Sequence, residues 1–367
     1  MFEPAEGLFG TFITEEWIVN EFARSYGVQI SHLKFQRIGE TEGSFSRVCL
    51  MECESNGRLP RKLIVKIPTC LTYVENRRRR GWTHGDYSHI RDLLITYHNT
   101  ETLFYQHAGG VVGVPQIFLS QRPYPTCSRG YLCDEMKSIL ALYANIQKGC
   151  ANVPDDVRSR LNTNVFELLS PTTLSLETLT QRLNRMSLWR PELKSTFQKL
   201  VQLLPKILDH HLISRLHFEC PHQHLLVHGD LYSSNILWQN GTVKAIIDYQ
   251  MVHYGNPVED LVRLFTTGLT ASERKGHTIG LLEYYRIQLT SLITGLEQTF
   301  TSDWLFSCYK IIFPMAGLWA IVSLHASFES STSQEPSDSS KLDRITKKIY
   351  GIAVEITETV NCTNVHQ

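Results

Sequence analysis

The sequence predicts an α+β protein with two lobes, a small N-terminal lobe built on an antiparallel sheet and a larger, mostly helical C-terminal lobe. Apolar and polar residues alternate through much of 33–67, which is typical of strands. From Lys137 onward the apolar spacing is mostly helical, and one β-hairpin interrupts this half. A chain of 367 residues is long for a single core, so we expect two domains, at 1–137 and 138–367.

Composition limits the classes of function. The 36 Lys and Arg balance the 36 Asp and Glu, so the chain has no general field that would attract nucleic acid or an acidic membrane. Nine cysteines are scattered without a pairing pattern, and Met1–Gly10 does not resemble a signal peptide. These features predict a cytoplasmic protein with reduced thiols, and nothing in them indicates an obligate protein partner.

No segment predicts a membrane span. The most apolar stretch, Ile311–Leu324, contains Pro314 and is shorter than the ~20 residues that a bilayer requires. We expect it to form a buried helix of the core.

The N-terminal lobe is predicted to combine an amphipathic helix within 1–30 and a helix at 93–107 with several strands. The expected strands are at 33–38, 45–53, 62–67, 114–119 and 130–133. A polar, basic stretch at 73–92 is expected to be a long loop with helical pieces. Cys49 and Cys53 fall on one face of a strand, which favours packing over metal binding.

The C-terminal lobe is predicted to hold helices at 174–186, 191–211, 280–298 and 341–359. A Ser-rich segment at 330–340 is expected to be a flexible loop. The lobes should meet near 134–138, and a cleft between lobes is a usual place for a nucleotide site.

The most informative segment reads HGDLYSSNILWQNGTVKAIIDYQ and begins at His228. Asn240-Gly241 predicts a hairpin turn between two apolar runs. Asn235 and Asp248 supply the hard oxygen ligands that magnesium prefers, since Mg²⁺ takes its remaining ligands from phosphate and water. Asp230 is then available to orient or deprotonate an attacking hydroxyl, which is the arrangement of a phosphoryl-transfer site.

The context of this segment matters more than its first three residues. His84-Gly85-Asp86 repeats the tripeptide, but Arg91 stands where a metal ligand would be needed and no hairpin ending in Asp follows. We expect His228 and Asp260 to support the loop around Asp230 through hydrogen bonds.

Lys66 is the candidate cation for the phosphates, because it lies in an otherwise apolar strand where an unpaired lysine is costly. Glu101 lies on the apolar side of the helix at 93–107 and could pair with it. The alternatives are an edge-strand lysine with a solvated head and a glutamate on a solvated helix face.

Gly39–Ser46 is the candidate nucleotide loop, in which Gly43 permits close approach of the backbone and Ser44 and Ser46 can donate hydrogen bonds. The loop matches a GxGxxG pattern incompletely, and a plain hairpin turn is the alternative. The adenine is expected against backbone groups near Glu135 and Met136.

Several segments together resemble the choline-kinase-like and aminoglycoside-phosphotransferase-like branch of the protein-kinase-like fold, and within it the CHK-kinase-like family of nematodes and insects, which includes the ecdysteroid kinases. The segments are HGDLYSSNILW, IIDYQ, VKIP, HNTETLFYQ and VEDLVRL, within roughly residues 33–330. The resemblance implies an ATP- and Mg²⁺-dependent kinase acting on a small-molecule hydroxyl. It implies that Asp230 is the base, that Asn235 and Asp248 bind magnesium, and that Lys66, paired with Glu101, contacts phosphate.

Two other functions compete with this one. A kinase-like regulator that binds ligands without turnover would carry the same fold. A nucleotide-dependent oxidoreductase is suggested by Ala108–Gly113, which approximates a dinucleotide-binding fingerprint, but a helical pattern precedes it where a strand is required.

Two further clusters are set aside on their spacing. Histidines crowd 210–228 without the spacing of a zinc site. Arg77–Arg80 could grip a phosphate or serve as a nuclear address, although such a run is usually a solvated face. The sequence does not identify the acceptor substrate.

Overall fold

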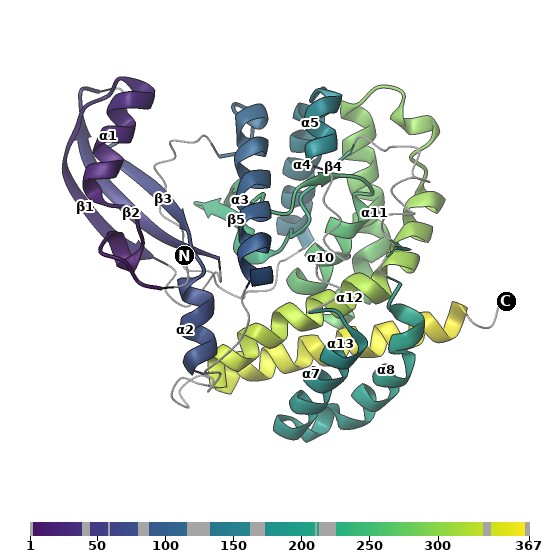
Figure 1. The fold of residues 1–367 in the computed structure, drawn as a ribbon. Coiled ribbons are helices and arrows are strands. Elements are labelled where there is room, and N and C mark those ends of the chain that lie inside the picture. Colours follow the sequence, from purple (N-terminus) through teal and green to yellow (C-terminus); the bar gives the residue numbers. More distant parts are fainter. Residues whose placement is uncertain are drawn as a thin grey trace. The chain divides into compact units, whose positions relative to one another are not determined.

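The chain forms two compact units in the computed structural model (Figure 1). The structure describes residues 3–38, 45–57, 59–79, 88–115, 133–161, 173–209, 211–212, 225–332 and 339–363. Of these, the first unit contains the residues up to Gly110 together with Pro115, and the second contains Val111–Val114 and the residues from Cys133 onward. The boundary expected at 137/138 falls inside helix α4 (Cys133–Gly149), which belongs to the second unit.

The first unit is built on a three-stranded antiparallel sheet in the order β1-β2-β3. Its strands are β1 (Ile30–Ile38), β2 (Ser46–Ser55) and β3 (Lys62–Pro68). These confirm three of the predicted strands. In the register of β2 and β3, Val48 lies opposite Lys66. Strand β3, which carries the lysine, is at the edge of the sheet.

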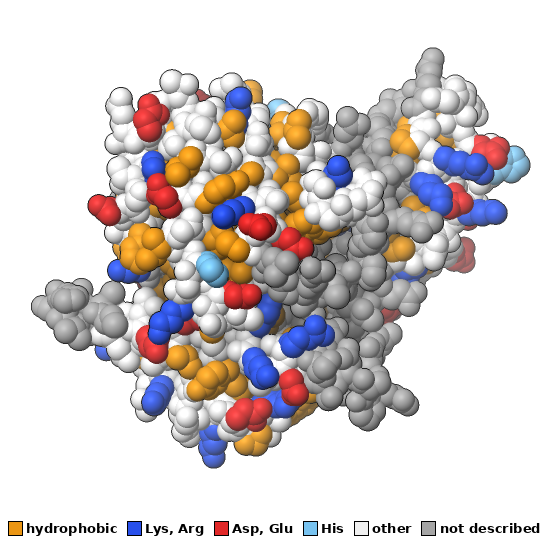
Figure 2. Space-filling view, turned by 180° about the vertical axis from the view of Figure 1, so that it is seen from behind, with side chains coloured by type: hydrophobic (Ala, Val, Ile, Leu, Met, Phe, Trp, Pro, Cys, Tyr) orange, Lys and Arg blue, Asp and Glu red, His pale blue; other side chains and the backbone are white. Residues whose placement is uncertain are grey.

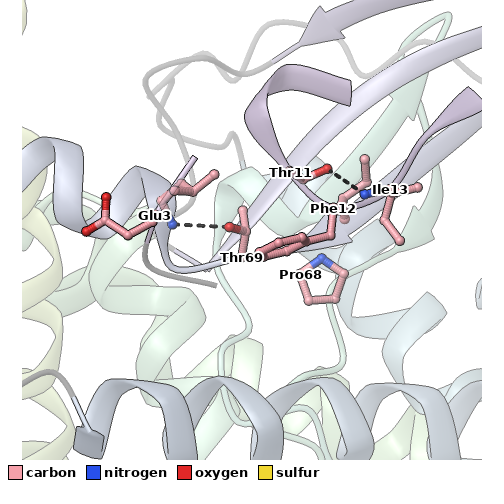
Figure 3. A pocket seen from close by; sticks show the side chains of 8 residues that line it. Glu3, Thr11, Phe12, Ile13, Pro68 and Thr69 are labelled. Carbon is pink, nitrogen blue, oxygen red and sulfur yellow. Dashed lines mark hydrogen bonds between the residues drawn. The ribbon is translucent and has the colours of Figure 1, made fainter. Parts of the chain in front are cut away.

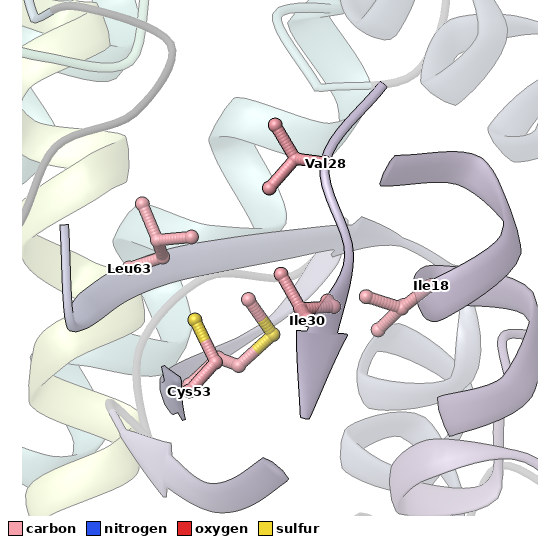
Figure 4. Packing of buried hydrophobic residues seen from close by; sticks show 6 residues of the cluster. Ile18, Val28, Ile30, Cys53 and Leu63 are labelled. Atoms are coloured by element: carbon pink, nitrogen blue, oxygen red, sulfur yellow. The ribbon is translucent and has the colours of Figure 1, made fainter. Parts of the chain in front are cut away.

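Helix α1 (Glu15–Tyr26) covers part of this sheet and confirms the predicted N-terminal helix. Thr14 caps it by accepting a hydrogen bond from the backbone N–H of Trp17, and Gly27 ends it in the left-handed conformation that glycine adopts without strain. The core between helix and sheet is a cluster of buried side chains (Figure 4): Ile18, Val28, Ile30, Met51, Cys53 and Leu63. Cys49 and Cys53 are both buried, as the alternation predicts.

Two helices complete the described part of the first unit. They are α2 (Leu71–Arg79) and α3 (Ser88–Ala108), with a short 3-10 turn, η1 (Leu8–Gly10), near the N-terminus. Helix α3 confirms the helix expected at 93–107, and Gly110 follows it with a φ of 89°. Arg47 ties the N-terminal segment to α2 by hydrogen bonds to the carbonyl of Phe9 and to Glu75.

The last two predicted strands of the N-terminal lobe are not borne out at their described residues. Val114 lies in a bend, and Cys133 is the first residue of α4, whose first turn carries Asp134 and Glu135. Acidic residues at this position stabilise a helix N-terminus, which is why the strand assignment of Cys133 was wrong. The intervening residues 116–132 lie outside the described part of the chain.

The second unit is mostly helical, as predicted (Figure 1). Its helices are α4, α5 (Asp155–Arg160), α7 (Leu176–Trp189), η2 (Pro191–Leu193), α8 (Lys194–Ile207), α10 (Val258–Gly268), α11 (Ala271–Leu292), η4 (Leu296–Gln298), α12 (Ser302–Thr332) and α13 (Ser339–Thr363). Helix α4 packs against α11, and α12 packs between α10 and α13. Every residue of α10 is buried, so this helix lies at the centre of the unit.

Helix α12 contains the predicted core helix at 311–324. Among the described residues, the segment Ser302–His325 alone has the length and apolar composition that could cross a membrane, and 67% of its apolar window is buried inside the protein. A core helix passes the same test, and the packing of α12 on two neighbouring helices fits that role. The segment expected to be a loop at 330–340 is helical at both ends, since α12 runs to Thr332 and α13 begins at Ser339, and residues 333–338 lie outside the described part of the chain.

The predicted hairpin is present in the second unit. Strands β5 (Ile236–Gln239) and β6 (Thr242–Ile246) pair antiparallel, with η3 (Ser233–Asn235) leading into them. Asn240 and Gly241 both have positive φ, 52° and 73°, as a tight type I′ turn requires.

A second short pair of strands frames the segment around Asp230. It consists of β4 (Leu226–Val227) and β7 (His253–Tyr254).

Over the face drawn in Figure 2, Lys and Arg side chains are interleaved with Asp and Glu, as the balanced composition predicts.

Candidate active site

The loop that carries Asp230 turns at Gly229, directly after strand β4. Gly229 has a φ of 82°, and a Cβ at this position would lie 2.3 Å from the carbonyl oxygen of Met251. Both the backbone conformation and the lack of space require glycine. The glycine of the tripeptide therefore has a local reason in this structure: it lets the loop pass close to the segment that follows the hairpin.

Asp260 holds this loop through hydrogen bonds to its backbone. Its carboxylate accepts hydrogen bonds from the backbone N–H groups of His228 (2.5 Å) and Gly229 (2.9 Å) and from the hydroxyl of Tyr143 (2.6 Å). Burial raises the pKa of Asp260, whereas the hydrogen bonds from the Tyr143 hydroxyl and the His228 backbone favour its ionised form. The expected supporting role of Asp260 is confirmed, and the structure adds Tyr143 as its partner from α4.

His228 joins the loop to the end of the hairpin. Its Nδ1 accepts a hydrogen bond from the backbone N–H of Asp230 (3.2 Å), so its ring proton lies on Nε2, which donates to the carbonyl of Ile247 (2.9 Å). The ring also packs on Tyr249, with 4.6 Å between centroids. This confirms that His228 braces the loop backbone.

Hydrogen bonds bring the segments of all three predicted oxygen-bearing residues together. The Nδ2 of Asn235 donates to the carbonyl of Asp230 (2.9 Å), and the N–H of Ile247 donates to the carbonyl of Asn235 (2.9 Å). Asp248 follows Ile247 directly and has a φ of 69°, which is rare for a residue with a side chain. Such a conformation is kept where the surroundings enforce it, and functional sites are common among such places.

The side chains of Asn235 and Asp248 fit a magnesium ion in their chemistry. The amide of Asn235 uses its nitrogen for Asp230, which leaves its oxygen for a cation, and Asp248 offers a carboxylate. Among the described residues, no group of three or more His, Cys, Asp or Glu is arranged to hold a metal. Two protein ligands are compatible with magnesium, because phosphates and water complete its shell.

Arg263 is a site residue that the sequence reasoning missed. Its Nε and Nη2 donate to the same oxygen of Asp230, Oδ1, at 3.1 and 2.8 Å. The arginine side chain is 5% exposed and that of Asp230 is 14% exposed. A signal existed in the sequence: an arginine three residues after Asp260, in the middle of the apolar run Leu261–Phe265, is costly to bury unless it is paired.

In the first unit, Lys66 and Glu101 form the expected ion pair. The Nζ of Lys66 lies 2.7 Å from the Oε2 of Glu101, and the glutamate is the more buried of the two, with side-chain exposures of 32% and 10%. Glu101 is therefore not on a solvated helix face, which excludes that alternative. The contact of Lys66 with phosphate stays a prediction.

The other predicted nucleotide-binding residues are placed only in part. Gly43 and Ser44 lie outside the described residues, and Ser46 is the first residue of β2, opposite Pro68. Glu135 and Met136 lie in the first turn of α4, where the Met136 side chain is fully buried. Their contact with adenine, like that of Ser46 with phosphate, stays a prediction.

A cavity of about 120 Å³ lies elsewhere in the first unit. It is lined by the N-terminal segment around Thr11–Ile13 and by the end of β3 at Ile67–Thr69, with Glu3 and Leu71 (Figure 3). None of the predicted site residues that the structure describes lines it, although Ile67 follows Lys66 directly in β3.

The remaining sequence motifs have structural explanations. Ala108 ends α3, and the glycines after it form turns, so a helix precedes the fingerprint-like stretch where a dinucleotide site requires a strand. Arg77 lies over the ring of Tyr73 (5.3 Å) and donates to its hydroxyl. His210, His217, His222 and His224 lie outside the described residues.

The chain has a kinase-like fold. The chain belongs to the family DUF1679, described as "Uncharacterized oxidoreductase dhs-27", which it matches over residues 1–122 and 124–363. It is also similar to the "Uncharacterized kinase-like protein D1044.1" of Caenorhabditis elegans, with 30% identity over 102 residues. That match spans 27% of this chain and 27% of the relative, about a quarter of each.

A solved structure with a similar fold confirms the predicted fold class. Choline kinase from Cryptosporidium parvum Iowa II is similar with a TM-score of 0.51 at 10% identity, covering 91% of each chain. An ethanolamine kinase from Plasmodium vivax has a TM-score of 0.45 at 11% identity, covering 89% of this chain and 83% of that one. At 10% identity the likeness to the choline kinase shows the protein-kinase-like fold and no more.

Proposed function

We propose that this protein is an ATP- and Mg²⁺-dependent phosphotransferase that acts on a hydroxyl group of a small molecule in the cytoplasm. The observation that carries the proposal is that hydrogen bonds fix the side chain and the backbone of Asp230. Arg263 holds one of its carboxylate oxygens, Asn235 holds its backbone carbonyl, and the loop around it is fixed by Asp260. Such preorganisation suits a group that must meet an acceptor hydroxyl in one geometry.

In this proposal, Asp230 orients the acceptor hydroxyl and accepts its proton late in the transfer. Both bonds from Arg263 end on Oδ1, so Oδ2 is the oxygen that faces the acceptor. Asn235 and Asp248 would hold magnesium, which when bound neutralises charge on the terminal phosphates. Arg263 keeps the carboxylate from rotating away between turnovers.

Lys66 supplies the protein's own cation for the phosphates, and Glu101 keeps its ammonium in place. An ion-paired lysine of this kind acts by position and charge and needs no change of protonation. Gly43, Ser44 and Ser46 are proposed to cover the phosphates, and the backbone at Glu135 and Met136 to contact the adenine.

The test is Asp230→Ala in the full chain. We expect nucleotide binding, measured by thermal shift with Mg-ATP, to stay within about twofold, while phosphate transfer to any alcohol falls by about three orders of magnitude or more. Turnover at the parent rate in Asp230→Ala would show that the base has been assigned wrongly.

The family description names an oxidoreductase, so this second function is tested alongside. It predicts a flavin or nicotinamide absorbance in the purified protein, or turnover of NAD(P)H with a carbonyl compound. The turn after α3 argues against it, as described above. A regulator without catalysis would bind Mg-ATP and release no ADP with any alcohol.

A further inference from the structure

The guanidinium of Arg263 occupies the aromatic faces beside Asp230. Its central carbon lies 5.2 Å from the ring centroid of Tyr232 and 5.5 Å from that of Trp319, within the range of a cation–π contact. Tyr232 comes from the loop before the hairpin and Trp319 from α12. The rings that could have surrounded a cationic substrate here already hold a cation of the protein.

Two buried donors at this place have no acceptor. The Nη1 of Arg263 and the Nε1 of Trp319 are inaccessible to solvent and form no hydrogen bond within the structure described here. Both groups can only donate. Leaving such donors unpaired in a protein interior is costly, and native structures keep few of them, often where a ligand or water completes the set.

The direction of the guanidinium links these donors to the chemistry. Its Nε and Nη2 are used by Asp230, which leaves Nη1 as the third nitrogen of the same rigid plane. Because Nη1 points away from Oδ1, a group that it binds lies across the guanidinium from Asp230, at roughly 6 Å from that oxygen. Trp319 adds a second donor within the span of a small molecule.

We propose that Arg263 and Trp319 form an acceptor subsite that binds an oxygen atom of the substrate a few bonds away from its reacting hydroxyl. The substrate class is then an anionic or neutral alcohol with a neighbouring carboxylate, carbonyl or hydroxyl oxygen, and ammonium alcohols are disfavoured. This inference rests on the proposed phosphotransferase function and specifies its acceptor.

The reaction balances with ATP as the donor. The acceptor oxygen forms a bond to the γ-phosphorus, the bond from that phosphorus to the bridging oxygen breaks, and ADP leaves with the electron pair. The acceptor's proton passes to Asp230. The subsite takes no part in these steps and acts only by orienting the substrate.

Physical reasons disfavour choline and ethanolamine at this place. An ammonium group would meet the positive charge of Arg263 at short range, and it has no lone pair to accept from either donor. It would also find the faces of Tyr232 and Trp319 taken. An oxygen atom of the substrate is attracted by the positive charge of Arg263 and has lone pairs that accept from both donors.

Four alcohols test the proposal on the full chain. Glycerate is an anion with oxygen acceptors, and hydroxyacetone is neutral with a carbonyl acceptor. Neohexyl alcohol is neutral and has no oxygen besides its hydroxyl, and choline has the same shape as neohexyl alcohol but carries a positive charge. Binding is measured by calorimetry in the presence of Mg-ADP, and phosphorylation by phosphorus NMR. We expect glycerate and hydroxyacetone to be preferred over the other two by at least about tenfold.

Trp319→Phe is the sharpest variant, because it keeps an aromatic ring and removes the donor. It should raise KM for the preferred alcohols about tenfold and leave kcat and the binding of Mg-ATP little changed. Trp304→Phe, the same change near the start of α12, is the matched control and should have no such effect. Thermal unfolding of both variants separates a loss of folding from a loss of the subsite.

The outcomes distinguish the two proposals. The subsite proposal would be overturned by a preference for choline, by a failure of both glycerate and hydroxyacetone to bind, or by an unchanged KM in Trp319→Phe. ADP formation with any alcohol would still support a kinase. Glycerate binding that weakens in Trp319→Phe, with no ADP formed under any condition, would support the subsite and reject the kinase.

Discussion

Tyr143 and Asp260 are 117 residues apart in the chain and lie 2.6 Å apart in the structure, hydroxyl to carboxylate. The tyrosine is on α4 and the aspartate on α10, and both are fully buried. Through this contact, α4 supports the carboxylate that holds the backbone before Asp230. The position of the proposed base therefore depends on a helix that contains none of the residues proposed for the chemistry itself.

Removal of the Tyr143 hydroxyl should affect both stability and turnover. Tyr143→Phe leaves Asp260 without one of its three donors, so we expect a loss of about 1–3 kcal/mol in the free energy of unfolding. We also expect kcat to fall about tenfold, since the loop loses part of its support. Urea unfolding and steady-state kinetics measure the two effects.

Tyr254→Phe is the control for this change. The Tyr254 hydroxyl is also buried, but it donates to the carbonyl of Cys150 and not to Asp260. This variant should lose about 1 kcal/mol of stability and keep kcat. An equal fall in kcat in both variants would mean that destabilisation alone explains the effect of Tyr143.

The Lys66–Glu101 pair should matter for nucleotide turnover far more than a neighbouring pair of the same kind. Lys66→Met is expected to lower kcat/KM for ATP by about two to three orders of magnitude, because a charge on the phosphates is lost. Lys62, in the same strand, pairs with Glu52 at 2.6 Å on the exposed surface. Lys62→Met should leave the kinetics unchanged, and a comparable loss there would contradict a specific role for Lys66.

Magnesium dependence should change at the two proposed ligands and not at a nearby amide. Asp248→Asn should raise the Mg²⁺ concentration needed for half-maximal activity at least about tenfold, since a charged oxygen ligand becomes neutral. Asn235→Ala should do the same and also loosen the carbonyl of Asp230. Asn240→Gly, in the hairpin turn, is the control. A titration curve for Asp248→Asn that overlays the parent would remove Asp248 from the metal site.

The pair of His253 and Glu259 predicts a pH dependence of stability. Its atoms Nε2 and Oε2 are 3.4 Å apart in the interior. Burial lowers the pKa of His253, but the charge of the nearby Glu259 and the hydrogen bond to the carbonyl of Met251 outweigh this, so the pKa is raised above 6.5 in the folded state. The stabilisation is then complete below pH 6.5 and is lost as the pH rises through the folded pKa.

Urea unfolding between pH 6 and pH 9 measures this effect, and its slope should not exceed about 1.4 kcal/mol per pH unit for one proton. Glu259→Gln should remove that slope, because the partner's charge is gone. A parent protein equally stable at both ends of the range would contradict the raised pKa.

The sequence by itself determined the local parts of the site. The Asn240-Gly241 turn, the alternation in β2 and β3 and the helix that carries Glu101 follow from short-range rules of backbone conformation and apolar spacing. The ion pair of Lys66 and Glu101 was also within reach, because a lysine in an apolar strand needs a partner. The segments of Asp230, Asn235 and Asp248 could be predicted to meet, because a loop that leads into a hairpin lies close to the residue that ends it.

Only the tertiary structure decided what surrounds Asp230. Arg263 pairs with it from α10, Trp319 approaches from α12, and Tyr143 supports it through Asp260 from α4. These contacts join residues that are 33 to 117 positions apart in the chain. Helical spacing tells which face of each helix is buried, but it does not tell which buried polar group meets which, because that depends on how the helices pack. The support of the proposed base and the chemistry of its acceptor are therefore properties of the packed core.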